Sequence, residues 1–374
     1  MRKYFIKTYG CQMNKSDSER IAGWYESRGW KKAKKIEEAD EVVINTCSVR
    51  QSAEDRVYGL INNLKNLKSQ ISNLKSKFQN LKSLKPKIIL TGCMLRYPIA
   101  DLKKKLPVVD EFKKISEFQT RNSQFVIRNS KIHAWVPIME GCSHYCTYCV
   151  VPYARGPEKS RDFEEIVCEV EELAKRGYKY VTLLGQNVNS YGKEFKISNL
   201  KSQISKLNLK SENLKNFKTP FALLLAVLHE ILGIEKISFV TSNPWDLTDD
   251  IIEAMSLPKI DRYLHLPVQS GDDEVLRRMN RPYTAKQYLA LVKKIRRRIP
   301  DIKIGTDIIV GFPGETEEQF QNTVKLCKKV GFEKAYIAMY SPRPGTAAFK
   351  FKDDVSYEEK KRRWQILEKL INRE

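Results

Sequence analysis

Short apolar runs alternate with helical patterns through the first third of the chain. The apolar runs cover residues 4–8, 41–46 and 87–92, and the residues between the first two favour a helix from Ser16 to Gly29. Ser16 and Glu19 have the spacing of a capping box, which would place the helix start at Ser16. This β–α–β order predicts an open parallel α/β domain of the Rossmann or flavodoxin-like kind, with helices covering the sheet.

The same alternation resumes near residue 133 and continues to the end of the chain. Six apolar runs are separated by helical patterns, at residues 134–139, 178–184, 236–240, 263–268, 303–310 and 334–340. Eight βα units close a full barrel, so six predict a partial (β/α)6 barrel that is open at one side. We therefore predict an N-terminal domain over residues 1–115, a linker over 116–132 and a barrel over 133–374.

A cysteine follows each of the three N-terminal apolar runs. These residues are Cys11, Cys47 and Cys93. Because the predicted strands are parallel, the three thiols should meet at the carboxyl edge of the sheet, where open α/β sheets bind ligands. One such cysteine is usually a small buried hydrophobe. Three in equivalent positions indicate a metal site.

A second cysteine triad follows the first predicted barrel strand. Cys142, Cys146 and Cys149 have the spacing C-x3-C-x2-C. Thiolates at this density select iron–sulfur clusters, zinc or Cu(I), and structural zinc needs a fourth ligand that is not nearby in the sequence. Three thiolates on a 4Fe–4S cluster leave one iron open to a substrate or cofactor. A zinc knuckle or a set of buried thiols is the alternative.

These motifs resemble the radical S-adenosylmethionine (SAM) enzymes and, among them, the methylthiotransferases. The resemblance rests on the barrel triad, on Tyr148 just before its third cysteine, and on the segments Val150 to Gly156, Tyr9 to Asn14 and Asn45 to Arg50. The branch most similar makes 2-methylthio-N6-isopentenyladenosine in tRNA. The fold that the family implies is a methylthiotransferase N-terminal domain followed by a radical SAM barrel.

The resemblance implies two 4Fe–4S clusters with different roles. The cluster on Cys142, Cys146 and Cys149 would bind SAM and generate a 5′-deoxyadenosyl radical. The cluster on Cys11, Cys47 and Cys93 would supply sulfur to the modified adenine beside the anticodon, and a second SAM would supply the methyl group. The implied partners are the tRNA anticodon stem-loop, an electron donor such as flavodoxin or ferredoxin, and a sulfur source, with the chain acting as a monomer.

Residues at the ends of the barrel strands are candidate cofactor contacts. The candidates for SAM are Gly185, Gln186, Ser242, Gln269 and Tyr148. Arg155 and Arg161, just past the second triad, are candidate contacts to RNA phosphates or bases. The alternatives are ordinary polar loop residues and, for the arginines, surface salt bridges.

The charge of the chain favours a polyanionic partner, because the net charge is +22 at pH 7. Two lysine-rich stretches, residues 62–87 and 193–218, contribute more than half of that excess and share the segment Asn-Leu-Lys-Ser-Gln-Ile-Ser. We interpret them as low-complexity insertions into surface loops, which tolerate added length. An additional basic loop that contacts RNA is the alternative.

The sequence also gives expectations about the cellular compartment and about alternative functions. Eight cysteines without an export signal indicate a reducing compartment, so we expect a cytoplasmic protein. No apolar run reaches the roughly 18 residues that a membrane span needs. Family members continue into a C-terminal TRAM domain, which we expect to be absent here. Alternative functions are a methylthiotransferase for threonylcarbamoyl-adenosine tRNA or a ribosomal protein, and a non-catalytic iron–sulfur RNA-binding protein.

Overall fold

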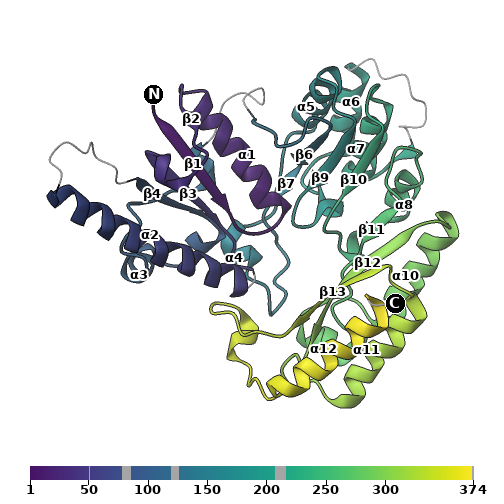
Figure 1. Ribbon diagram of the computed structural model, residues 1–374. Helices are drawn as coiled ribbons and strands as arrows, with labels where there is room; N and C mark the ends of the chain where they lie inside the picture. The colour runs from purple at the N-terminus through teal and green to yellow at the C-terminus, as the bar shows by residue number, and fades with distance from the viewer. Residues whose placement is uncertain (50, 78–85, 119–125, 207–215, 373–374) are drawn as a thin grey trace. The chain divides into compact units, whose positions relative to one another are not determined.

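The computed structural model describes residues 1–49, 51–77, 86–118, 126–206 and 216–372. The chain divides into two compact units (Figure 1). The N-terminal unit consists of residues 1–130 together with 153–155, and the barrel unit consists of residues 131–152 and 156–374.

A parallel sheet forms the centre of the N-terminal unit. Its strand order is β2-β1-β3-β4-β5, with the bounds β1 (Lys3–Thr8), β2 (Lys31–Lys32), β3 (Glu41–Thr46), β4 (Lys87–Gly92) and β5 (Glu111–Phe112). The helices are α1 (Gln12–Glu26), α2 (Gln51–Lys77) and α3 (Ile99–Lys105), with single 3-10 turns at η1 (Ile36–Glu38), η2 (Cys93–Arg96) and η3 (Ile115–Phe118). The open parallel α/β fold is confirmed.

The central strands are apolar throughout because both of their faces are buried. On β3, Val42 and Ile44 pack into one core cluster, whereas Val43 packs into another with Tyr4 and Tyr25. A strand that is buried on both faces reads as a continuous apolar run, which is why these strands stand out in the sequence.

Helix α1 begins at Gln12, one turn before the predicted start at Ser16. Cys11 occupies the N-cap position, and Ser16 lies buried inside the helix. Glu19 does not close a capping box, since its carboxylate accepts hydrogen bonds from the backbone and side-chain N–H groups of Asn129. The predicted helix start was therefore wrong.

The lysine-rich stretches are largely helical where the structure describes them. Helix α2 continues through the first stretch to Lys77, and the second stretch contains α6 (Ile197–Lys206). Leu200 and Ile204 on α6 are buried in the barrel core. The described parts of these segments are therefore helices and not loops, in agreement with the helical intervals of three and four between their Leu and Ile residues. That the two stretches are insertions remains a prediction. The rest of the two stretches, residues 78–85 and 207–215, lies outside the described residues.

Six parallel strands form the partial barrel that the sequence predicts. They follow chain order, as β6 (His133–Pro137), β9 (Tyr180–Leu184), β10 (Lys236–Phe239), β11 (Tyr263–His265), β12 (Lys303–Val310) and β13 (Lys334–Met339). Between β10 and β11 the ladder is reduced to one bridge, Ile237 to Ile260. The two-residue strands β7 (Met139–Glu140) and β8 (Lys159–Ser160) form an antiparallel pair on either side of the second cysteine triad.

Helices cover the outer face of the barrel (Figure 1). Their bounds are α5 (Phe163–Lys175), α7 (Pro220–Glu230), α8 (Asp249–Met255), α9 (Asp273–Arg278), α10 (Ala285–Arg298), α11 (Glu317–Val330) and α12 (Tyr357–Ile371), with 3-10 turns η5 (Val188–Ser190), η7 (Pro244–Asp246) and η8 (Ala347–Lys350). The short helix α4 (Val151–Arg155) ends in residues 153–155, which belong to the N-terminal unit. Helix α7 is buried from Phe221 to Leu228. Among the described helices, none is long and apolar enough to cross a bilayer.

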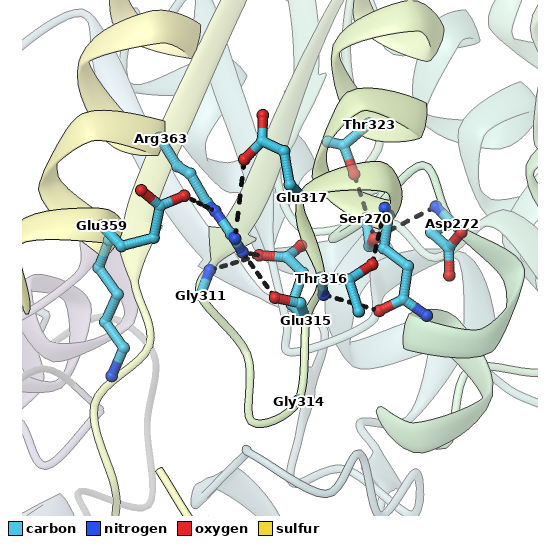
Figure 2. Close-up of polar contacts among 12 residues, drawn as sticks. Ser270, Asp272, Gly311, Gly314, Glu315, Thr316, Glu317, Thr323, Glu359 and Arg363 are labelled. Carbon is cyan, nitrogen blue, oxygen red and sulfur yellow. Dashed lines mark hydrogen bonds and ion pairs between the residues drawn. The ribbon is translucent and has the colours of Figure 1, made fainter. Parts of the chain in front are cut away.

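Helix α12 is anchored to the loop that follows β12. Arg363 points among three carboxylates (Figure 2), lying 2.9 Å from Glu315, 2.6 Å from Glu359 and 3.8 Å from Glu317. The buried Glu315 carboxylate also accepts the backbone N–H of Gly311 at 2.6 Å. The Glu315 carboxylate therefore links the loop after β12 to α12.

Candidate metal centres

The N-terminal triad lies at the carboxyl edge of three adjacent strands. Cys11 follows β1, Cys47 follows β3 and Cys93 follows β4, and the order of these strands in the sheet is β1-β3-β4. Cys47 and Cys93 are buried, whereas Cys11 is exposed. The parallel topology thus puts one thiol at the end of each strand, as the sequence pattern predicted.

A close approach at Gly10 brings the first two of these loops together. Gly10 has φ of +127°, and a Cβ there would lie 2.8 Å from the Cβ of Cys47 and 2.5 Å from Oδ1 of Asn14. Any side chain at this position would therefore collide with the site as well as strain the backbone.

Two buried asparagines fix the loops that carry these cysteines. Nδ2 of Asn14 donates to Oδ1 of Asn45 at 3.1 Å and to the Thr46 carbonyl at 3.0 Å, and Nδ2 of Asn45 donates back to the Asn14 carbonyl at 2.8 Å. The Cys11 thiol donates to Oδ1 of Asn14. The motifs contain both asparagines, but sequence reasoning gave them no role, because side-chain pairing across strands leaves no pattern along the chain.

Arg155 lies beside the N-terminal triad. Its Nη2 atom is 2.9 Å from Oδ2 of Asp17, with side chains that are 9% and 7% exposed. Cys93 and Cys11 also lie near the guanidinium. Burial opposes the charge of Arg155, but Asp17 and the two cysteines outweigh burial and raise the pKa of Arg155. A fixed cation next to thiolates offsets the negative charge that they carry when they bind a metal.

The two arginines predicted to contact RNA are both engaged inside the chain. Arg155 forms the buried pair just described. Arg161 lies 2.8 Å from Oε2 of Glu169 and donates to the Pro137 carbonyl at 2.6 Å. The predicted RNA contacts of Arg155 and Arg161 remain predictions.

In the barrel unit, each thiol of the second triad accepts a hydrogen bond from nitrogen. Asn187 Nδ2 donates to Cys142 Sγ at 3.1 Å, Arg281 Nη1 donates to Cys146 Sγ at 3.5 Å, and the Val151 N–H donates to Cys149 Sγ at 3.5 Å. N–H groups directed at cysteine sulfurs stabilise the anionic form and tune the potential of a bound cluster.

Burial keeps two of these thiols protonated when no metal is bound. It raises the pKa of Cys142 to about 11 and that of Cys149 to about 12. Binding a metal must therefore displace a proton from each of them. The loop itself depends on Gly141, which has φ of +79° and where a Cβ would lie 2.0 Å from the Pro157 carbonyl oxygen.

Arg281 is a site residue that sequence reasoning missed. Its guanidinium lies over the rings of Trp245, at 4.6 Å, and Tyr283, at 5.3 Å, and it donates to the Pro267 carbonyl at 3.0 Å. It is separated from Cys146 by 135 positions, so no spacing in the sequence points to the pair. His144 packs against Trp245.

Among the predicted SAM contacts, two buried polar atoms have no hydrogen-bond partner within the described part of the chain. They are Oγ of Ser242 and Oε1 of Gln186. Buried polar atoms are rarely left unpaired, so these atoms fit contacts to a polar ligand. Gln269 has φ of +66°, and Thr241, which follows β10, has φ of +72°. Such backbone strain often marks a functional site.

The other two predicted SAM contacts are packed within the protein. A Cβ at Gly185 would lie 2.6 Å from Cγ of Met139, so the glycine admits that side chain. Tyr148 packs against a small core that contains Met279, Phe312 and Tyr340. The predicted cofactor contacts of Gly185 and Tyr148 remain predictions.

The two triads fit iron–sulfur clusters in their donor chemistry. Among the described residues, no three His, Cys, Asp or Glu side chains gather around a single metal ion. A 4Fe–4S cluster binds each thiolate through a different iron, so its ligands need not converge on one point. The thiols, the N–H donors and the unpaired polar atoms of Ser242 and Gln186 together suit a cluster with a polar ligand beside it.

Comparisons with known proteins agree with this description. The Radical SAM superfamily matches residues 136–327, and the Uncharacterized protein family UPF0004 matches residues 3–113. The chain is 42% identical to the tRNA-2-methylthio-N(6)-dimethylallyladenosine synthases of Thermotoga petrophila and Thermoanaerobacter sp., across 99% of this chain and 82% and 78% of those proteins.

A solved structure shares the fold at low sequence identity. The radical S-adenosylmethionine methyltransferase TsrM from Kitasatospora setae, with cobalamin and a [4Fe-4S] cluster bound, superposes with a TM-score of 0.60 and 13% identity. The match covers 93% of this chain and 77% of that one. At this identity the similarity concerns the fold alone.

Proposed function

Because the chain belongs to the radical SAM family of tRNA-2-methylthio-N(6)-dimethylallyladenosine synthases, we propose that it converts N6-isopentenyladenosine beside the tRNA anticodon to its 2-methylthio derivative. The observation that carries this proposal is the pair of separate cysteine triads, in a chain that matches these enzymes over 99% of its length. One triad lies at the carboxyl ends of three parallel strands, and the other lies in the loop that follows β6 and β7.

Cys142, Cys146 and Cys149 would hold the cluster that works with SAM. When bound, such a cluster supplies the electron that cleaves SAM and yields a carbon radical. The chain positions its thiols with N–H groups from Asn187, Arg281 and the backbone of Val151. Ser242 and Gln186 offer unpaired oxygens to the polar groups of SAM.

Cys11, Cys47 and Cys93 would hold the second cluster, which is associated with sulfur insertion. The Asn14–Asn45 pair fixes their loops, and Arg155 offsets their charge. The further proposed partners are an electron donor such as flavodoxin or ferredoxin and a sulfur source. We also propose a cytoplasmic location and a monomeric state.

The test is product analysis with defined RNA. The anaerobically reconstituted protein is incubated with dithionite, SAM and an anticodon stem-loop containing N6-isopentenyladenosine, and the nucleosides are analysed by mass spectrometry. Matched stem-loops carry adenosine or threonylcarbamoyl-adenosine. We expect methylthiolation of the isopentenyl substrate. Modification of only the threonylcarbamoyl stem-loop, or SAM cleavage with no modified RNA, would contradict the proposed substrate.

A further inference from the structure

Two phenylalanines of the barrel unit are exposed beside the loop that carries the second cysteine triad. Phe349 is 49% exposed and Phe351 is 40% exposed, and they alternate with the exposed residues Lys350 and Lys352. We call residues 349–352 the aromatic–basic segment. Large aromatic side chains usually lie inside a protein, so two neighbouring exposed ones next to a candidate active site indicate a binding surface.

The aromatic–basic segment is held rigidly against the cysteine loop. Ala348, immediately before it, is buried, and its N–H donates to the Thr147 carbonyl at 2.7 Å. The Ala348 carbonyl accepts hydrogen bonds from the Tyr340 hydroxyl at 2.8 Å and from the Phe351 N–H at 3.0 Å. Thr147 lies between Cys146 and Cys149 in the sequence, so the residue that directly precedes the segment is hydrogen-bonded to the triad loop.

The triad loop contributes an exposed aromatic residue of its own. Tyr145, which directly precedes Cys146, is 55% exposed. Its carbonyl accepts a hydrogen bond from Nδ2 of Asn280 at 2.9 Å. This bond fixes the backbone of the loop at the residue whose ring faces solvent.

The lysines of the segment keep their charge available. The nearby acidic residues are engaged elsewhere: Asp353 pairs with Lys360 at 2.5 Å, and Asp354 accepts the Gly314 N–H at 2.7 Å. Within the described residues, Lys350 and Lys352 form no salt bridge. The segment itself is therefore aromatic and carries two lysines with no salt-bridge partner among the described residues.

We propose that the aromatic–basic segment, together with Tyr145, is a stacking platform for unpaired nucleotides of the RNA substrate next to the base that is modified. The inference rests on the proposed function. Proteins recognise single-stranded RNA by stacking bases on aromatic side chains while cations attract the phosphates. An acidic electron-donor protein would also be attracted by the lysines, but it gives no reason for the exposed phenylalanines.

The test measures binding of the reconstituted full-length protein to the isopentenyl anticodon stem-loop. Phe349→Ala combined with Phe351→Ala should weaken binding about tenfold or more, since each stacked base is normally worth at least about a fivefold effect. Lys350→Gln combined with Lys352→Gln should reduce the dependence of log K on log salt by about 0.7 for each lost phosphate contact. Leu232→Ala, at an 88% exposed residue before β10, is the matched control and should bind like the wild type.

Phe351 contacts Phe312, so its replacement could also disturb packing inside the protein. Phe349→Ala alone therefore serves as a second variant. Iron content checks that each variant is folded. If the wild type methylthiolates the stem-loop and the folded variants bind it with unchanged affinity, the stacking platform is overturned but the proposed function stays intact. Slower reduction by flavodoxin with unchanged RNA affinity would identify a protein-docking surface and also overturn it. A wild type that neither binds nor modifies the stem-loop would overturn both.

Discussion

Replacing Arg155 with methionine tests whether the buried pair beside the N-terminal triad supports that unit. Met has a similar length but no charge, so the change leaves the Asp17 carboxylate buried without the cation that lies 2.9 Å away. The Arg155 guanidinium also lies near Cys93 and Cys11, whose presence favours its charge. The substitution therefore removes the charge partner of Asp17 and a cation near two thiols at the same place.

The expected loss of stability follows from the burial of the pair. Both side chains are less than a tenth exposed, and removing one partner of a buried ion pair usually costs about 3–5 kcal/mol. Every ~1.4 kcal/mol corresponds to a tenfold change in an equilibrium constant. The opening equilibrium of the N-terminal sheet should therefore rise by roughly two to three and a half orders of magnitude.

Hydrogen exchange of the full-length, metal-free protein measures this opening equilibrium locally, because the amides of β1, β3 and β4 report on opening of the N-terminal sheet. Arg161→Met removes an arginine–carboxylate pair of the barrel unit and should leave these amides unchanged. Arg155→Met combined with Asp17→Leu removes both charges and should recover most of the loss. A loss of protection below tenfold in Arg155→Met, or a double variant as unstable as the single one, would refute the reasoning.

Three further predictions concern the barrel unit. Hydrogen bonds from Arg362 lower the pKa of Glu359 from 4.5 to about 2. The ionised carboxylate therefore stabilises the folded state above pH ~4.5, and this stabilisation is lost as the pH falls towards 2. Glu359→Gln should flatten the pH dependence of the unfolding free energy in that range. Arg281→Met removes a cation bonded to Cys146 and should lower the cluster's reduction potential in an EPR titration, whereas Arg281→Lys should lower it less. Leu200→Ala on α6 should cost about 2–5 kcal/mol in urea unfolding, and a loss below ~0.5 kcal/mol would show that α6 is not part of the core.

The fold and the six cysteines could be predicted because each leaves a local signal. A strand that is buried on both faces is a continuous apolar run, as Val42 to Ile44 illustrate. Parallel strands also share one carboxyl edge, which places three cysteines from separate parts of the sequence at that edge. For α6, the high lysine content suggested a surface loop, whereas the helical spacing of Leu200 and Ile204 correctly indicates a helix.

The residues around the cysteines could not be predicted, because their partners are distant in the sequence. Arg155 pairs with Asp17 from 138 positions away, and Arg281 reaches Cys146 across 135 positions. Such pairs depend on where the folded backbone places two side chains and have no period or spacing along the chain. Arg155 stood in a recognisable motif, but only its buried contacts connect it with the N-terminal triad.

The division of work between the two triads is tested most directly by measuring SAM cleavage and RNA methylthiolation in the same reaction. Cys47→Ala should still form 5′-deoxyadenosine from SAM but yield no methylthiolated adenosine, while Cys142→Ala should lose both products. Iron content should fall in each variant by about the four atoms of one cluster. If folded Cys142→Ala still cleaved SAM, or if folded Cys47→Ala still made the methylthiolated product, the assignment of the two sites would be contradicted.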